Sequence, residues 1–205
     1  MRSEDHQPDG WIDTWSGKRF FPLRPSAQEV DIGDIASSLA HQCRFGGHTR
    51  EYYSVAQHCV HVAELLLNSG DPDLALWGLL HDAAEAYLLD LPRPIKRAPG
   101  MELYRAAEQE VLQVVAERFC LEPHLPQAVR EADERLFATE IRDLMNPRMR
   151  EYTPLVQPLF ETTVPWPPAV ARVRYLEMFN DLQKRRGIFA EVYPSCSTPA
   201  SASTL

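Results

Sequence analysis

Apolar residues recur at intervals of three and four along most of the chain, which is the spacing of one face of an α-helix. Behind Asp31, four such residues fall on one stripe: Ile32, Ile35, Ala36 and Leu39. A second helix is predicted after Ser54, a residue typical of helix N-caps, and runs to Leu67. A third, from about 73 to 87, is apolar nearly all round, so we expect it at the centre of the domain.

The same spacing predicts further helices over about 102–119, 126–145 and 169–185. Leu91-Pro92-Arg93-Pro94 should break the third helix, and the proline-rich stretch 151–168 should be irregular. At the start of the chain, segments 11–15 and 19–21 flank the turn-type sequence Ser16-Gly17-Lys18, which indicates a β-hairpin. We therefore expect an all-α domain over 11–186 with a small N-terminal β-hairpin, a flexible N-terminus (1–10) and a disordered C-terminal tail (187–205).

Composition narrows the class of protein. The 205 residues are 44% hydrophobic and 24% charged, which is typical of a globular domain rather than a disordered chain. No apolar run approaches the roughly 20 residues that span a bilayer, and the first ten residues are too polar for a signal peptide. Four scattered cysteines form no CxxC pair, so we expect a cytoplasmic protein. The net charge of −8 argues against a nucleic acid polymer as partner.

The main chemical signal is the pair His81-Asp82 inside the most apolar predicted helix. Burying an unpaired carboxylate costs several kcal/mol, so such a pair needs a cation or strong partners. A His and an Asp satisfied by hydrogen bonds at a helix end are the alternative. Glu85 lies four residues after His81, on the same face of a helix, where it could deprotonate a water molecule. Its alternative role is an ion pair with a nearby base.

Other segments offer further ligands for a metal. The preceding helix carries His58 and His61, and the helix after 126 carries Asp133. One His, a His-Asp pair and a distant Asp make a nitrogen and oxygen donor set, which suits Mn²⁺, Co²⁺, Fe²⁺ or Zn²⁺ better than Ca²⁺. Four protein ligands leave open positions for water and a substrate oxygen, as hydrolysis requires.

The order His58…His81-Asp82…Asp133 resembles the HD-domain superfamily of metal-dependent phosphohydrolases. The resemblance covers roughly residues 11–186 and implies a single HD-domain helical bundle. Several segments are similar to bacterial 5′-deoxynucleotidases and phage dATP triphosphohydrolases: Gln42-Cys43-Arg44-Phe45, Tyr53-Ser54-Val55-Ala56-Gln57-His58, Leu79-Leu80-His81-Asp82-Ala83-Ala84-Glu85-Ala86, Asp90-Leu91-Pro92-Arg93-Pro94-Ile95-Lys96 and Ala132-Asp133.

The resemblance also implies roles for single residues. The metal ligands would be four: His58, His81, Asp82 and Asp133. His61 is the rival of His58 and is expected to be a surface or supporting residue. Glu85, together with the ligand Asp82, would act on the nucleophilic water.

The residues implied to bind substrate are Arg44, Phe45, Asp90, Lys96 and Arg130. Arg44 would hold the α-phosphate, for which a planar guanidinium is well suited. Asp90 would contact the sugar near its 3′ position, or simply end a helix. Lys96 and Arg130 would contact the phosphate chain, although Arg130 also suits a solvated helix face. Phe45 would flank the sugar or base, or fill the core, and no motif assigns His48.

The implied activity is hydrolysis of (deoxy)nucleotides at the α-phosphate, releasing the nucleoside with phosphate or tripolyphosphate. It would use one divalent transition metal (Mn, Co, Fe or Zn), with additional Mg²⁺ for a triphosphate. The partners would be a nucleotide and other copies of the chain, with no membrane and no nucleic acid polymer. The alternative is a catalytically silent HD-like module that senses nucleotides or scaffolds a partner. The presence of all four ligands with Glu85 and Arg44 favours the enzyme.

Overall fold

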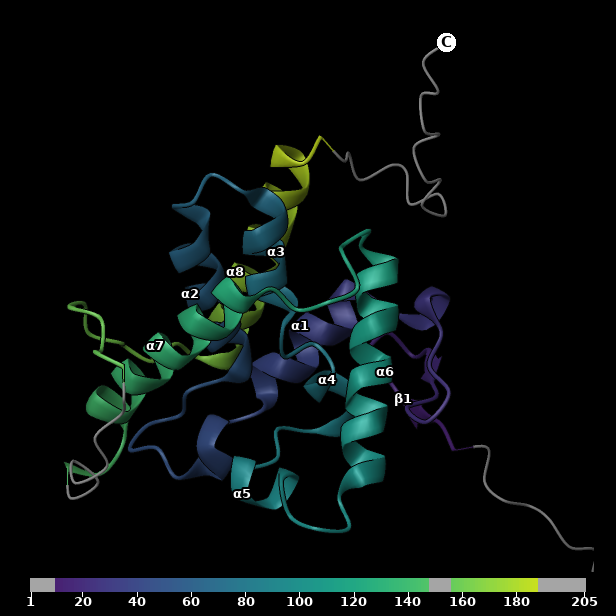
Figure 1. Cartoon of the computed structure of the whole chain (residues 1–205), viewed down its shortest axis with the longest axis horizontal. Helices are drawn as coiled ribbons and strands as arrows, with labels where there is room; N and C mark the ends of the chain where they lie inside the picture. The colour runs from purple at the N-terminus through teal and green to yellow at the C-terminus, as the bar shows by residue number, and fades with distance from the viewer. Residues whose placement is uncertain (1–9, 148–155, 188–205) are drawn as a thin grey trace, which may run out of the picture.

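The structure, a computed structural model, describes residues 10–147 and 156–187 (Figure 1). Two short antiparallel strands, β1 (Ile12–Asp13) and β2 (Arg19–Phe20), form a hairpin in which Ile12 lies opposite Phe20. The other elements are helical: η1 (Ala27–Glu29), α1 (Ile32–His41), η2 (Arg44–Gly47), α2 (Val55–Leu67), α3 (Pro72–Leu80), α4 (Glu85–Leu88), α5 (Arg93–Lys96), α6 (Glu102–Arg118), α7 (Gln127–Leu144) and α8 (Pro168–Arg185). The predicted mostly helical fold with an N-terminal hairpin is confirmed.

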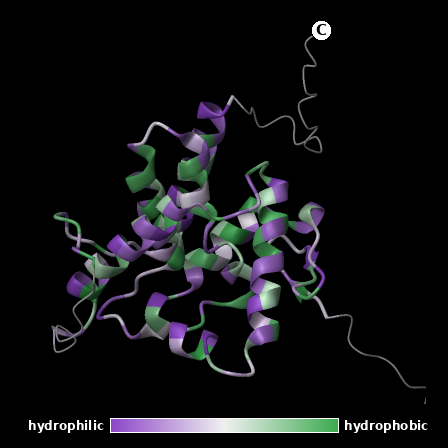
Figure 2. Cartoon of the chain, in the orientation of Figure 1, coloured by the Kyte–Doolittle hydropathy of each residue, from purple (hydrophilic) through white to green (hydrophobic). Residues whose placement is uncertain are grey.

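Helix α3 lies at the centre of the bundle, packed against α2, α7 and α8 (Figure 1). The predicted central position is confirmed, because six consecutive residues of α3 are buried: Ala75, Leu76, Trp77, Gly78, Leu79 and Leu80. Figure 2 shows apolar segments of α2 and α3 in the interior, whereas α6 carries many hydrophilic positions. Tyr175 of α8 joins that helix to α3 by donating a hydrogen bond to the Leu79 carbonyl at 2.8 Å. None of the helices within the described ranges is both long and apolar enough to cross a membrane.

A glycine allows α2 and α3 to approach closely. An ideal Cβ on Gly78 would lie 2.7 Å from Leu66 Cδ1 and 3.2 Å from the backbone N and Cα of Ala63. Contacts below about 3.4 Å are tighter than packed side chains normally make, so a larger residue at 78 would push the helices apart. The close approach matters because α2 carries His58 and α3 leads directly into His81.

The predicted third helix, 73–87, is wrong in one respect. Helix α3 ends at Leu80, and α4 begins only at Glu85. Between them the backbone tightens into hydrogen bonds between residues three apart, from Ala83 N to Leu80 O and from Glu85 N to Asp82 O, both 2.9 Å. His81 Nδ1 donates to the Gly78 carbonyl at 2.7 Å, and this side-chain competition for a late helix carbonyl is a physical reason for the break.

Other predicted boundaries agree with the structure to within two residues. Asp31 caps α1 by accepting a hydrogen bond from Gly33 N at 2.8 Å, and Ser54 caps α2 by accepting one from Gln57 N at 3.1 Å. The stretch 156–167 contains no helix or strand, as expected, whereas 151–155 lies outside the described residues. The predicted flexible N-terminus and disordered tail also lie outside them, apart from Gly10 and Gly187. The prediction that segment 91–94 breaks the third helix is wrong, because α3 already ends at Leu80 and α4 ends at Leu88; the short helix α5 begins within this segment.

Candidate metal centre

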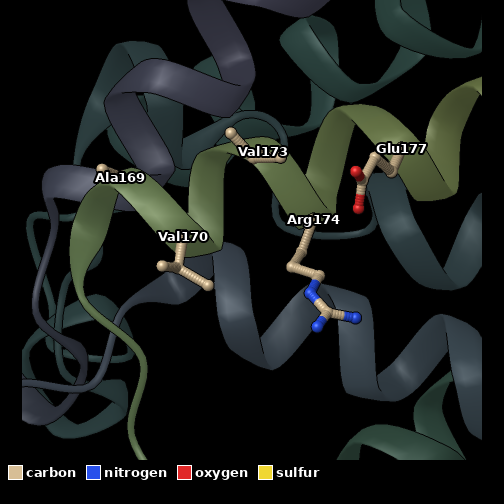
Figure 3. A pocket seen from close by; sticks show the side chains of 5 residues that line it. All are labelled: Ala169, Val170, Val173, Arg174 and Glu177. Carbon is tan, nitrogen blue, oxygen red and sulfur yellow. The ribbon is translucent and has the colours of Figure 1, made fainter.

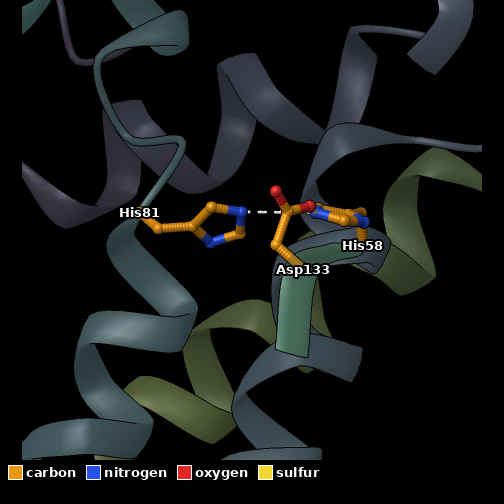
Figure 4. Close-up of side chains that lie close together, drawn as sticks. All are labelled: His58, His81 and Asp133. Carbon is orange, nitrogen blue, oxygen red and sulfur yellow. Dashed lines mark hydrogen bonds and ion pairs between the residues drawn. The ribbon is translucent and has the colours of Figure 1, made fainter. Parts of the chain in front are cut away.

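Donor atoms from three parts of the chain lie around His58. Those of His58, His81 and Asp133 all lie within 4.8 Å of one another, whereas Asp82 shares a group of this size with His81 and Cys59. His58 Nε2 lies 3.3 Å from His81 Nε2, 3.1 Å from Asp133 Oδ1 and 3.8 Å from Asp82 Oδ2. His81 Nε2 lies 3.3 Å from the same Asp82 oxygen. In Figure 4 the two imidazole rings reach toward each other from α2 and from the end of α3, with the Asp133 carboxylate from α7 between them. The sequence-predicted ligand set is therefore brought together in space.

The outer hydrogen bonds of the two rings decide which nitrogen faces the other donors. A carbonyl oxygen only accepts, so His81 Nδ1, which lies 2.7 Å from Gly78 O, carries the proton. His58 Nδ1 lies 2.6 Å from Glu140 Oε1, which orients that ring in the same way. In the neutral form of each ring, Nε2 therefore carries the lone pair and faces the Asp82 and Asp133 oxygens. Either a proton on one of the rings or a metal ion would reduce the repulsion between these atoms.

The geometry fits a divalent transition metal. Two ligands about 2.1 Å from one ion, at angles of about 90–110°, stand about 3.0–3.4 Å apart. The donor separations of 3.1 Å and 3.3 Å fall within this range, and the 3.8 Å between His58 and Asp82 corresponds to a wider angle. Two imidazole nitrogens and two carboxylate oxygens suit Mn²⁺, Co²⁺, Fe²⁺ or Zn²⁺.

The charges around the donors favour a positive charge at this place. Burial and the cation Arg44 both lower the pKa of His58, but the carboxylates of Glu140 and Asp133 outweigh them and raise that pKa to about 9. Burial raises the pKa of Asp133, yet the hydrogen bond and charge of His58 hold it well below its ordinary range. The metal-free chain therefore holds a proton here, and an incoming ion competes with it.

Arg44 lies beside the donors, as predicted. It is buried in η2, with Nη1 3.4 Å from Asp82 Oδ2 and Nη2 3.2 Å from Glu140 Oε2. The next residue, Phe45, has a φ of 57°, which a non-glycine residue seldom adopts, and its ring stacks on Phe137 at 5.7 Å. Phe45 is half-buried, so part of its side chain packs in the protein and part remains open to solvent.

Glu85 makes the ion pair that was its alternative role. Lys96 Nζ lies 3.5 Å from Glu85 Oε1 and 2.5 Å from Glu108 Oε1. Within the described residues, Glu85 Oε2 is buried with no hydrogen-bond partner. Burial, reinforced by the charges of Asp82 and Asp90, raises the pKa of Glu85 well above its ordinary value. A carboxyl with a raised pKa binds a proton more readily than an ordinary glutamate does. Lys96 contacts the side chains of both Glu85 and Glu108.

Asp90 and Arg130, the other two residues predicted to bind substrate, make no direct contact with the four donors within the described residues. Asp90 follows α4, half-buried, and its backbone N–H donates to Gln42 Oε1 at 3.1 Å. Burial raises its pKa, partly offset by Arg44. Arg130 is exposed and donates from Nη2 to the Leu125 carbonyl at 3.1 Å, which agrees with a solvated helix face; within the described part of the chain, no contact joins it to the donors.

His58, rather than His61, belongs to the centre. The Nδ1 of His61 lies 2.9 Å from Glu64 Oε2, and its ring is 4.9 Å from that of Trp166, so it has the supporting surface role expected of it. His48 is exposed at the end of η2, and the structure gives it no role in the centre.

Sequence reasoning missed two charged residues beside the centre. Glu140 is completely buried and contacts both His58 and Arg44. It follows Asp133 by seven residues, two turns along one helix face, and this spacing was the available signal. Arg93 Nη2 lies 3.4 Å from Asp133 Oδ2, and its Nη1 lies 2.6 Å from Glu134 Oε1. No sequence signal links Arg93 to α7.

A separate hollow lies on the outer side of α8 (Figure 3). It is lined by residues of that helix alone: Ala169, Val170, Val173, Arg174 and Glu177. It contains none of the four donors and none of the residues predicted to bind substrate, so it is separate from the candidate metal centre.

Comparison with known proteins supplies the family. The chain is 36% identical over 180 residues to "Uncharacterized protein YfdR" of Escherichia coli, an alignment that covers 86% of this chain and 97% of the relative. The chain belongs to the YfdR family. Another relative of this YfdR-family chain, "Uncharacterized protein RCAP_rcc00048" of Rhodobacter capsulatus, is 35% identical over 127 residues, covering 60% of the chain and 64% of the relative. No family model matches the chain.

Proposed function

We propose that this YfdR-family protein is a metal-dependent phosphohydrolase of the HD-domain type that hydrolyses (deoxy)nucleotides at the α-phosphate. One observation carries the proposal: His58 Nε2 lies 3.1–3.8 Å from donor atoms of His81, Asp82 and Asp133, which are separations that ligands of a single ion would have. Two imidazole nitrogens and two carboxylates make a nitrogen and oxygen donor set that suits a divalent ion. When bound, a divalent ion would polarise a phosphate oxygen and lower the pKa of a water molecule.

Arg44 supports the choice of a phosphate substrate. Its guanidinium has five N–H donors, and the contacts with Asp82 and Glu140 leave N–H groups on Nη1 and Nη2 for further acceptors. A planar, buried guanidinium next to the metal ligand Asp82 would hold a phosphate oxygen and offset charge that develops there during attack.

Glu85 is the proposed proton acceptor. Its carboxyl is buried with a raised pKa, and a stronger base removes a proton from water more effectively. Lys96, 3.5 Å from Glu85, would balance the negative charge of this carboxylate and of the phosphate. We propose Asp90 for the sugar, Phe45 for the sugar or base, and Arg130 for the outer part of a longer phosphate chain. The expectations of a homo-oligomer in the cytoplasm remain part of this proposal.

A product assay tests the proposed activity. Metal-stripped protein would be loaded separately with Mn²⁺, Co²⁺, Fe²⁺ and Zn²⁺ and supplied with each deoxynucleoside mono- and triphosphate, resolving phosphate from tripolyphosphate. We expect metal-dependent release of nucleoside and one of these two products. Absence of turnover with every ion and substrate would refute the proposal.

A pair of matched variants tests the site. Asp82→Ala removes one ligand, and we expect it to abolish both metal binding and turnover. Asp181→Ala makes the same chemical change on the exposed surface of α8, where Asp181 pairs with Arg185, and should alter neither. Turnover that persists in Asp82→Ala would show that the site is misassigned.

A further inference from the structure

Glu140 occupies the space behind the candidate metal centre. Its side chain is fully buried on α7, at 0% exposure. One carboxylate oxygen, Oε1, accepts from His58 Nδ1 at 2.6 Å. The other, Oε2, accepts from Arg44 Nε at 3.2 Å and lies 3.2 Å from Nη2 of the same guanidinium. One buried carboxylate thus contacts a metal-facing imidazole with one oxygen and the proposed phosphate-binding arginine with the other.

These contacts belong to a closed ring of four side chains. His58 contacts Glu140, Glu140 contacts Arg44, Arg44 Nη1 lies 3.4 Å from Asp82 Oδ2, and Asp82 faces His58 Nε2 across the centre at 3.8 Å. Helix α7 contacts His58 at both ring nitrogens, because it also carries Asp133, two turns before Glu140. A displacement of Glu140 would therefore disturb the metal-facing and phosphate-facing groups together.

We propose that Glu140 is a positioning residue that couples metal binding to phosphate binding. It fixes the His58 ring with Nε2 toward the ion, and it holds the plane of the Arg44 guanidinium next to the same ion. A carboxylate that accepts from the outer nitrogen of a ligand imidazole orients the ring and strengthens it as a donor. The inference rests on the proposed function, since it assumes that the four donors bind a metal.

The first test compares two Glu→Gln changes on α7. Glu140→Gln leaves one acceptor oxygen for two donors, so His58 or Arg44 must lose its partner. We expect metal affinity, measured by competition titration with Co²⁺ and Zn²⁺, to fall about 10- to 100-fold. Glu131→Gln is the matched control, because Glu131 is exposed and accepts from Gln127 in the same helix. Its metal affinity should stay at the wild-type value.

Glu140→Gln could misfold, because it leaves the buried cation of Arg44 without the carboxylate of Glu140. A second pair of variants therefore removes Arg44 as well. Arg44→Met removes the cation, and Arg44→Met/Glu140→Gln removes both buried charges, which proteins often tolerate. The single variant should raise KM for the nucleotide and keep metal affinity within about threefold of wild type. The double variant should show the same raised KM and, in addition, lose metal affinity about 10- to 100-fold. Equal metal affinities in the two variants would overturn the proposal.

A third measurement needs no substitution. In the Zn²⁺-loaded wild-type protein, nitrogen-15 NMR of the histidine rings should find His58 protonated at Nδ1, with the metal on Nε2. A proton on Nε2 would overturn the role of Glu140. Wild-type protein that binds no divalent ion would overturn the proposed function as well, whereas metal-dependent turnover with unchanged affinity in the Glu140 variants would overturn this inference alone.

Discussion

The backbone carbonyl of Gly78 accepts a hydrogen bond from the ring nitrogen Nδ1 of His81 at 2.7 Å. Because Gly78 has no side chain, α3 can lie directly against the backbone of Ala63 in α2. Position 78 therefore sets both the orientation of one candidate ligand and the distance between the helices that carry or precede two of them.

Gly78→Ala tests this arrangement. The new methyl group would meet backbone atoms of Ala63 at 3.2 Å, and the strain should exceed the roughly 1 kcal/mol that alanine gains over glycine in a helix. We expect a net loss of about 1–2 kcal/mol in urea unfolding and at least tenfold weaker Co²⁺ binding. Gly33→Ala in α1 is the control, because its methyl would meet only side-chain atoms, of Asp31 and Trp15, and metal affinity should not change. Unchanged Co²⁺ binding in Gly78→Ala would show that helix spacing does not control the site.

Two histidines one turn apart on α2 should behave oppositely. His58→Asn removes a donor that lies 3.1–3.8 Å from the other three, and we expect metal affinity to fall more than about 100-fold. His61→Asn disturbs only a surface pair with Glu64 and a contact with Gln57 and Trp166. It should bind metal as wild type does. Equal losses in the two variants, measured by metal titration, would contradict the assignment of His58.

Glu85→Gln separates a proton acceptor from a structural ion pair. As the base, Glu85 should contribute about 10²- to 10⁴-fold to kcat, and the variant should lose this factor while its metal affinity stays unchanged. The raised pKa of Glu85 means that its ionised form destabilises the fold above the ordinary carboxyl pKa, so the neutral glutamine should not lower stability at pH 7. A normal kcat combined with lower stability would leave Glu85 only the ion pair with Lys96.

Asp143 should make stability depend on acid pH. Its carboxylate accepts from Arg142 Nε at 2.6 Å and from Thr163 N at 2.8 Å, and so joins α7 to the stretch before α8. Burial raises the pKa of Asp143, but these hydrogen bonds outweigh it and lower that pKa overall. The contribution is therefore complete above the unfolded carboxyl pKa of about 3.9 and is lost as pH falls through the lower folded value.

The corresponding measurement is urea unfolding of Asp143→Asn and wild type at pH 7, 5 and 3. We expect the variant to be less stable at pH 7 and 5, and the difference to shrink at pH 3. Asp181→Asn, in an exposed pair with Arg185, should stay within about 0.5 kcal/mol of wild type throughout. A difference that grows as the pH falls would contradict the sign of the shift.

Local signals explain how much of the fold could be predicted. Asp31 and Ser54 precede apolar runs of helical spacing and cap α1 and α2 as expected, because caps and periodicity act over a few residues. The end of α3 at Leu80 was missed, since periodicity does not record that His81 bonds to a carbonyl of its own helix.

In the candidate site, too, some residues could be predicted from local signals and others could not. His58, His81, Asp82 and Asp133 could be chosen from their order and donor chemistry. The partners of Lys96 and Arg93 could not, because these long side chains reach Glu108 of α6 and Asp133 of α7, and no local pattern in the sequence records such contacts. Glu140 lies between the two cases, because its seven-residue spacing from Asp133 could be read from the sequence but its contacts with His58 and Arg44 could not.

The four donors come from α2, from the turn after α3 and from α7, so they meet only when the chain is folded. An ion with no affinity for the unfolded chain stabilises the folded form by about 2.7 kcal/mol when its concentration is 100 times its Kd. The melting temperature should therefore follow the supply of metal, and a chelator should act as a mild denaturant. Under the proposed function, the protein in a metal-poor cell would become easier to degrade as well as inactive.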